Sequence, residues 1–123
     1  MSEKPLVIVT RRLPELVETR LMELFNTKLS IDDKPFSKKQ LIDAIKEADI
    51  LVPTVTDRID TDVLEASSGK LKLIANFGNG TDHINIETAQ KKNIIHILIK
   101  ENFNMFFKLY SPFYNICLSY FSF

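Results

Sequence analysis

The residues best suited to chemistry in this 123-residue chain are the two glycines of the segment Asn76-Phe77-Gly78-Asn79-Gly80. Glycine adopts positive φ angles without steric cost, so the main chain of such a turn can approach a ligand closely. Successive backbone N–H groups in a turn can also form a concave nest that binds an anion. A carboxylate or a phosphate would suit this nest. The alternative is that the glycines only turn the chain after a strand, because an isolated glycine-rich turn is a weak motif.

Three acidic residues that lie close together in the sequence, Asp57, Asp60 and Asp62, have the side chains of a cation site. A calcium-binding loop needs more oxygen ligands and a bidentate glutamate at its end. Aspartate is also common at helix N-termini, where it accepts backbone hydrogen bonds and complements the helix dipole. We therefore expect a turn and a helix cap in this segment, and no metal site.

The other candidate side chains have no sequence neighbours that would activate them. His83 follows the glycines, and we expect it to orient the loop rather than to transfer protons. His96 has no adjacent carboxylate to fix its tautomer, and Cys117 has no nearby base. Arg11 and Arg12 could face an anion, but a solvated pair is the simpler interpretation. The residues alone therefore predict no catalytic group.

These residues lie between apolar segments that alternate in character along the chain. Short, continuous apolar runs such as Leu6–Val9 are typical of strands buried on both faces of a parallel sheet. Apolar residues at helical spacing follow Pro14, and Ser37 with Gln40 matches a capping box. The predicted strands are residues 6–10, 28–31, 50–52, 71–75 and a fifth from 93, and the predicted helices are residues 14–25, 38–48, a short one after 60 or 61, and 86–92.

The alternation predicts an α/β fold, because strand and helix recur about every 20 to 25 residues, as in right-handed βαβ units. We expect a flavodoxin-like three-layer sandwich with a parallel sheet. Ligands of such folds bind beyond the carboxyl ends of the strands. Those ends carry residues 10–12, 53–57 and 78–80, so we expect these three loops at the binding edge.

The segment LKLIANFGNGTDHINIETAQKKNII closely resembles the loop and following helix in the N-terminal domain of the D-isomer-specific 2-hydroxyacid dehydrogenases. The resemblance is nearest to the glyoxylate reductase and glycerate dehydrogenase branch, and it covers about residues 5–95. Members of that family reduce a 2-oxo acid to a D-2-hydroxy acid with NAD or NADP, which a Rossmann domain binds. The resemblance therefore implies an oxidoreductase whose substrate is a small 2-oxo or 2-hydroxy acid.

The resemblance also implies roles for four residues of the substrate site. In the family, the loop after the fourth strand offers backbone N–H groups to the substrate carboxylate, and Asn79 and Gly80 match those positions. Thr54 and Val55 match, less closely, a segment after the third strand that borders the same cleft. The resemblance and the physical interpretation thus agree that the glycine loop binds an anion.

The nucleotide-binding half of the family pattern has no counterpart in this sequence. No G-x-G-x-x-G occurs, so the pyrophosphate cradle at a helix N-terminus is missing. The family's catalytic Arg, Glu and His lie downstream of the matching segment. We therefore expect residues 1–95 to form a partial, incomplete substrate-binding domain that binds no NAD or NADP alone and needs a second polypeptide for activity. The alternative is a non-catalytic flavodoxin-like module that binds a small anion or a protein.

Residues 96–123 differ in composition from the preceding part of the chain. They hold nine of the twelve Phe and Tyr residues and no Gly, Asp, Arg, Thr or Val. Most of their residue types have A/T-rich codons, which favours a frameshift, a retained intron or a mispredicted end of a longer dehydrogenase. The alternative is a genuine short protein whose divergent aromatic tail covers the sheet. A truncation would expose apolar surface and predicts marginal folding, aggregation or a partner chain that covers this surface.

Composition and charge exclude several classes of partner. The 16 basic and 16 acidic residues give zero formal net charge, so nothing favours nucleic acid. The single cysteine fits a reducing compartment, and the N-terminus does not resemble a signal peptide. The longest uncharged run, residues 109–123, is shorter than the roughly 20 apolar residues of a membrane span. We expect a cytoplasmic protein with no membrane span and no nucleic acid partner.

Overall fold

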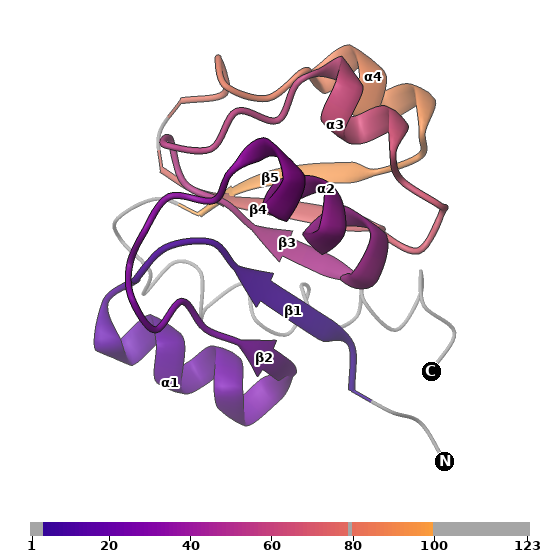
Figure 1. The fold of residues 1–123 in the computed structure, drawn as a ribbon. Helices are drawn as coiled ribbons and strands as arrows, with labels where there is room; N and C mark the ends of the chain where they lie inside the picture. The colour runs from indigo at the N-terminus through magenta and orange to yellow at the C-terminus, as the bar shows by residue number, and fades with distance from the viewer. Residues whose placement is uncertain (1–3, 79, 100–123) are drawn as a thin grey trace.

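The computed structural model describes residues 4–78 and 80–99, which form a parallel sheet with helices on both faces (Figure 1). None of the described helices is long and apolar enough to cross a membrane. The strands are β1 (Leu6–Val9), β2 (Asn26–Lys28), β3 (Ile50–Val52), β4 (Leu73–Phe77) and β5 (Ile95–Ile99), and the helices are α1 (Glu15–Leu24), α2 (Lys38–Glu47), α3 (Thr61–Glu65) and α4 (Ile86–Lys91).

The five strands lie in the order β2-β1-β3-β4-β5, and every neighbouring pair is parallel. This order is the one found in flavodoxin-like sheets. The expected α/β fold with a parallel sheet is therefore confirmed. Because all strands point the same way, the loops that follow β1, β3 and β4 meet at one edge of the sheet.

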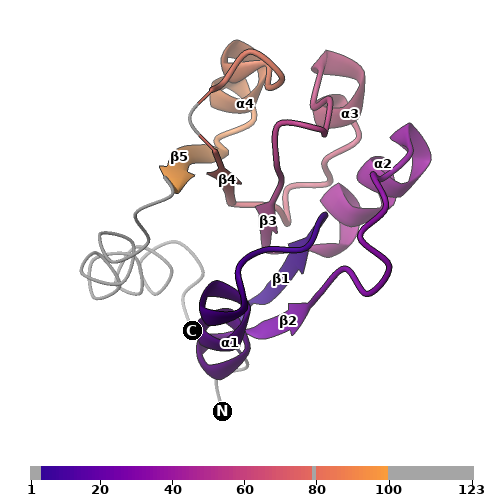
Figure 2. The same ribbon diagram turned by 90° about the vertical axis from the view of Figure 1, so that its left-hand side faces the viewer.

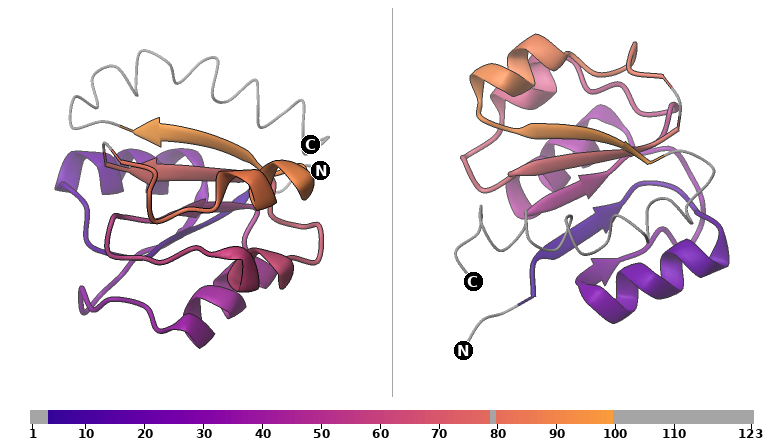
Figure 3. Two further views of the ribbon diagram at one scale, coloured as in Figure 1. Left: turned by 90° about the horizontal axis from the view of Figure 1, so that it is seen from above. Right: turned by 180° about the vertical axis from the view of Figure 1, so that it is seen from behind.

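Two apolar clusters hold the layers together on opposite faces of the sheet. Helix α1 lies on one face, and α2, α3 and α4 lie on the other (Figures 2 and 3). Val17 and Leu21 of α1 are fully buried against the first face, while Ile45 and Leu64 pack with Ile74 on the second. Burial of such side chains is the main driving force for this packing.

Polar side chains fix where three of the four helices begin. Ser37 accepts a hydrogen bond from the N–H of Gln40 at 3.2 Å, and the Gln40 side chain accepts one from the N–H of Ser37 at 2.8 Å. Asp60 and Asn85 each accept a hydrogen bond from the third residue of α3 and α4, respectively. The predicted capping box, and the helix cap predicted among Asp57, Asp60 and Asp62, are confirmed. Helix α1 instead begins directly after Pro14, with no side-chain cap.

The prediction of a second strand at 28–31 is wrong, because β2 is Asn26–Lys28. Helix α1 ends at Leu24, and the chain enters the sheet almost immediately, where the N–H of Asn26 donates to the carbonyl of Pro5 at 3.1 Å. Ile31 lies beyond the strand and is 91% exposed. The apolar character of residues 28–31 therefore does not mark the paired segment.

The prediction of a fourth strand at 71–75 is two positions early, since β4 is Leu73–Phe77. Leu71 is buried in the core but precedes the strand, and β5 pairs with β4 as far as Phe77↔Ile99. Strand β5 thus continues past Ile95, where the composition of the chain changes. The remainder of the predicted tail, residues 100–123, lies outside the described residues.

Replacement of Ser37 by alanine tests the capping box. Loss of an N-cap serine costs about 1 kcal/mol, so we expect the free energy of unfolding of Ser37→Ala to fall by about that amount in urea titrations. Ser68→Ala is the matched control, because Ser68 is an exposed loop serine and caps no helix. Equal unfolding free energies for the two variants would contradict the importance of the cap.

Candidate functional site

A cavity of about 530 Å³ lies at the edge of the sheet where the strand-end loops meet. Three of the four predicted site residues, Thr54, Val55 and Gly80, line it. Asn79, the fourth, lies outside the described residues. The remaining walls of the cavity are Arg11, Arg12, Leu13, Asp33, Thr56, Phe77 and Gly78. The structure thus brings the glycine loop and the segment after β3 to one cavity.

Gly78 has a backbone conformation and close surroundings that favour glycine. Its φ angle is +152°, and a Cβ atom added there would lie 3.2 Å from Cγ1 of Val55. Its N–H donates to the carbonyl of Ile99 at 2.9 Å, so this group is not available to a ligand. Within the described residues, no hydrogen bond uses the N–H of Gly80. Among the described residues of the loop, Gly80 thus has an N–H without a described partner, and Gly78 shapes the loop.

The side chain of Asn76 holds the glycine loop by a hydrogen bond to its main chain. Asn76 is fully buried, and its Nδ2 donates to the carbonyl of Gly80 at 3.0 Å. Its Oδ1 lies 2.8 Å from Nε2 of His83. Because an amide oxygen only accepts hydrogen bonds, His83 carries its proton on Nε2. The expectation that His83 orients the loop is confirmed by this contact.

Both histidines are shifted toward the neutral form. Burial lowers the pKa of His83 below its usual 6.5, although Asp57 and Asp82 oppose this shift. Burial also lowers the pKa of His96, and the nearby His83 adds to that effect. A neutral His83 retains the single Nε2–H that the bond to Asn76 requires.

The turn after β3 is built around the carboxyl group of Asp57. This group is 1% exposed, and its Oδ2 accepts hydrogen bonds from the N–H of Thr54 at 2.9 Å and from the hydroxyl of Thr10. Asp60 caps α3, and Asp62 lies in the first turn of that helix. The expected turn and helix cap are confirmed. The part of the chain that the structure describes contains no group of three metal-binding side chains.

Arg11 is held in the wall of the cavity by two partners. Its Nε donates to Oδ1 of Asp33 at 3.0 Å, and its Nη1 donates to Oγ1 of Thr56 at 3.2 Å. Oγ1 of Thr56 lies 2.8 Å from Oγ1 of Thr54. The expectation of a solvated arginine pair is therefore wrong for Arg11, whose side chain is only 23% exposed, whereas Arg12 is exposed.

Asp33 joins the loop after β2 to the loop after β1. Its Oδ1 accepts the N–H of Arg12 at 2.9 Å as well as the guanidinium of Arg11. These bonds lower the pKa of the Asp33 carboxyl, the Arg12 N–H having the larger effect. The position of Arg11 directly after a buried strand was the only sequence signal for its role, since Asp33 follows 22 residues later.

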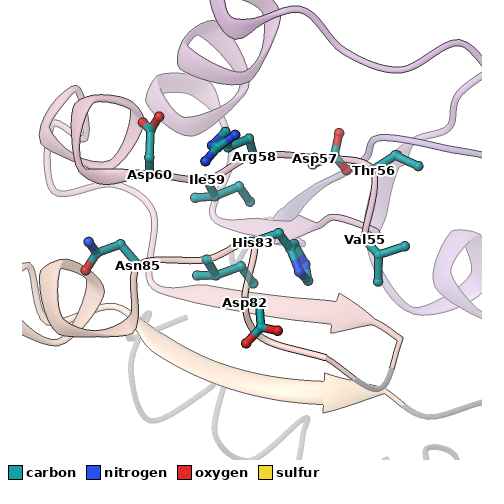
Figure 4. A pocket seen from close by; sticks show the side chains of 10 residues that line it. Val55, Thr56, Asp57, Arg58, Ile59, Asp60, Asp82, His83 and Asn85 are labelled. Carbon is teal, nitrogen blue, oxygen red and sulfur yellow. The ribbon is translucent and has the colours of Figure 1, made fainter.

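A second cavity, of about 600 Å³, lies on the other side of the Thr54–Asp57 turn. Figure 4 shows the side chains that line it, which come from residues 55–60 and 82–85. The N–H of Ile59 donates to the carbonyl of His83 at 2.7 Å, and the N–H of Asn85 donates to the carbonyl of Ile59 at 2.9 Å. This backbone pairing fixes the main chain of His83 against Ile59.

The residues present do not fit a dinucleotide cofactor. A pyrophosphate cradle needs glycines in the turn that opens a helix. The three glycines of the chain are Gly69, Gly78 and Gly80, and none of them opens a helix. Strand β1 leads into α1 through residues 10–14, which contain no glycine. No step of cofactor chemistry is therefore assigned to this chain.

Comparison with protein families matches residues 7–100 to the "D-isomer specific 2-hydroxyacid dehydrogenase, catalytic domain". A glyoxylate reductase from Korarchaeum cryptofilum is 41% identical over 91 residues, and one from Pyrococcus horikoshii is 37% identical over 91 residues. Each alignment covers 74% of this chain but only 27% of the relative. The chain therefore spans about a quarter of the length of these relatives.

Solved structures share the same fold. A putative D-isomer-specific 2-hydroxyacid dehydrogenase from a Polaromonas species has a TM-score of 0.71 at 23% identity. The matched region covers 77% of this chain and 30% of the Polaromonas chain. The 3-phosphoglycerate dehydrogenase of Entamoeba histolytica, solved with NAD⁺ bound, has a TM-score of 0.63 at 24% identity, covering 77% of this chain and 32% of its own. Both similarities concern the fold alone.

A Cβ atom at position 78 would strain the loop, and Gly78→Ala tests this. Such a backbone conformation costs of order 1–3 kcal/mol for a non-glycine residue, and we expect the free energy of unfolding to fall by about that amount. Gly80→Ala is the matched control, because an added Cβ meets no atom within 4 Å there and φ is not positive. Equal losses in urea titrations would show that the geometry of Gly78 is unimportant.

The lowered histidine pKa values predict a loss of stability in mild acid. Below pH 6.5 the unfolded chain binds more protons than the folded chain at His83 and His96. The free energy of unfolding is therefore fully retained above pH 6.5 and falls as the pH decreases through the folded pKa values. Urea titrations at several pH values check this, and His83→Gln with His96→Gln should flatten the dependence. If the free energy of unfolding of the double variant still fell with decreasing pH as in the wild type, the pH dependence would belong to other groups.

Proposed function

The chain belongs to the family of D-isomer-specific 2-hydroxyacid dehydrogenases, and we propose that it provides the substrate-carboxylate site of a glyoxylate reductase-like enzyme. The observation that carries this proposal is the glycine loop after β4. Gly80 lines the cavity with an N–H that no described residue uses, while its carbonyl is held by Asn76 at 3.0 Å. A loop fixed in this way presents donors to a carboxylate without paying for reorganisation.

Charge and hydrogen bonding in the cavity support the same substrate class. The guanidinium of Arg11 and the hydroxyl groups of Thr54 and Thr56 line it beside Gly80. These groups donate hydrogen bonds to the oxygen atoms of a small oxo or hydroxy acid. Val55 is 60% exposed and provides an apolar contact for the carbon skeleton. Thr54, Val55, Asn79 and Gly80 are the proposed substrate-binding residues.

Reduction of the oxo acid would require a hydride donor, NADH or NADPH, bound by a nucleotide-binding domain. The role of the described residues is then to bind and orient the acid. We also propose that residues 1–95 are an incomplete domain of a cytoplasmic enzyme, and that the aromatic segment 96–123 replaces the family's normal continuation. A partner chain would cover the apolar surface that this replacement leaves.

A non-catalytic module that binds a small anion is the second candidate. It is favoured by the lack of any dinucleotide cradle among the three glycines of the chain. The two candidates share the carboxylate site and differ in whether a nucleotide-binding partner completes it.

Titration of the ¹⁵N-labelled chain with glyoxylate tests the carboxylate site. We expect saturable shifts of the amide signals of Gly80 and Thr54, while the signal of Gly69, which is remote from the cavity, stays unchanged. Chloride at the same ionic strength is the control for unspecific anion effects. Absence of saturable shifts in the loop would reject both candidates.

The same preparation separates the enzyme from the binding module. NADH should not bind to the chain alone in either case. Addition of the isolated nucleotide-binding domain of the Pyrococcus horikoshii glyoxylate reductase should give glyoxylate-dependent oxidation of NADH only if the chain completes an enzyme. Saturable glyoxylate binding without this activity would leave the anion-binding module as the function.

A further inference from the structure

We propose that the terminal segment, residues 100–123, packs on the apolar side chains that β4 and β5 present on the side of the sheet that carries α1. These side chains are called the β4–β5 face. The inference is independent of the proposed function, since it concerns neither substrate nor cofactor. It gives the terminal segment the role of completing the core of its own chain, and any partner chain that covers this face would have to displace it.

The β4–β5 face consists of three cross-strand pairs of apolar side chains. The pairs are Leu73↔Ile95, Ala75↔Ile97 and Phe77↔Ile99. All six side chains belong to the apolar cluster that also contains the buried residues of α1. Apolar side chains gain stability when their surface is removed from water. The stability of this half of the sheet therefore depends on what packs against the face.

The described helices do not fully cover the β4–β5 face. Helix α1 packs beside β1 and β2, while α2, α3 and α4 lie on the opposite side of the sheet (Figures 1 and 2). Three of the six side chains, Phe77, Ile95 and Ile97, are only partly buried. No described strand pairs with the outer edge of β5. An apolar segment can therefore add to the core at this place.

The terminal segment has the composition that such a face requires. It holds nine of the twelve Phe and Tyr residues of the chain, and its only charged residues are Lys100, Glu101 and Lys108. Aromatic side chains bury large apolar areas and pack favourably against one another. The segment would leave much of this area in water unless it packed on an apolar surface.

The point of attachment favours the segment over a separate molecule. The segment begins directly after Ile99, which is itself part of the β4–β5 face. From β5 across β4 and β3 to β1 is about 15 Å, a distance that about five extended residues span. A tethered segment has an effective concentration in the millimolar range, which exceeds that of a second copy or a partner in dilute solution.

A spin label on Cys117, the single cysteine of the chain, tests this packing in the full-length protein. The measurement is the loss of amide NMR intensity with the oxidised label, relative to the reduced label. The signals of Ala75 and Ile97 should lose intensity. Those of Lys39 and Asp43, exposed residues of α2 on the opposite side of the sheet, should lose much less. Equal losses at all four residues, or no loss on β4 and β5, would overturn the proposal.

A mixed sample distinguishes the segment of the same chain from that of a second copy. ¹⁵N-labelled chain without a spin label is mixed with spin-labelled chain at natural isotope abundance, so that only contacts between copies reduce the signals. We expect Ala75 and Ile97 to keep their intensity in this mixture. A loss as large as in the singly labelled sample would assign the β4–β5 face to a second copy and overturn the proposal.

Ile97→Asp tests whether the β4–β5 face is the surface to which the segment binds. A carboxylate disfavours apolar contact because its burial is costly, so the loss of intensity at Ala75 should disappear. Leu98→Asp is the matched control. Leu98 is the next residue of β5, is 36% exposed and points to the other side of the sheet, so this variant should keep the loss at Ala75.

The double variant Phe106→Ser/Phe107→Ser keeps the test decisive if Ile97→Asp does not fold. It changes only the terminal segment and leaves every described residue intact. It should reduce the loss of intensity at Ala75, because two apolar side chains of the segment are removed. An undiminished loss in both this variant and Ile97→Asp would show that the segment does not pack on the β4–β5 face.

Discussion

The candidate site depends on one buried carboxyl group, that of Asp57. A single oxygen of this group accepts hydrogen bonds from Thr10 at the end of β1 and from the N–H of Thr54 after β3. Burial of such a group is costly unless it is hydrogen-bonded, so Asp57 can be buried here only because Thr10 and Thr54 donate to it. These hydrogen bonds fix the turn that places Val55 beside the glycine loop and Thr56 beside Arg11. The positions of Val55 and Thr56 in the cavity wall therefore depend on this interaction.

The rest of the site is arranged mainly by backbone geometry. Parallel strand order brings the loops after β1, β3 and β4 to one edge. Gly78 allows the last of them to pass beside Val55, where an added Cβ would lie only 3.2 Å from Cγ1. Asn76 then fixes the carbonyl of Gly80. Because a main-chain N–H recognises a carboxylate without regard to the rest of the acid, selectivity must come from the side chains of the wall. Arg11 and Arg12 are the cationic side chains of that wall, and Arg11 is the one that other loops hold in place.

Local patterns in the sequence predicted the parts of the fold that local physics determines. The capping box at Ser37, the cap at Asp60 and the third strand at 50–52 depend on neighbouring residues, and all agree with the structure. Strand β2 and the position of β4 were misjudged, because pairing with other strands, not apolar character, sets their ends. The role of Arg11 was missed because Asp33 and Thr56 reach it only in the folded chain. The origin of residues 100–123, which lie outside the described part, stays a prediction.

The hydrogen bond from Gly78 to the carbonyl of Ile99 has a mechanical consequence. Ile99 ends the last strand of the sheet, so whatever follows it in the chain is attached one residue away from an anchor of the glycine loop. This hydrogen bond and the five residue pairs between β4 and β5 together join the end of β5 to the glycine loop. Because Ile99 is also buried in the core, a displacement of the chain at this point would disturb the core and the loop together.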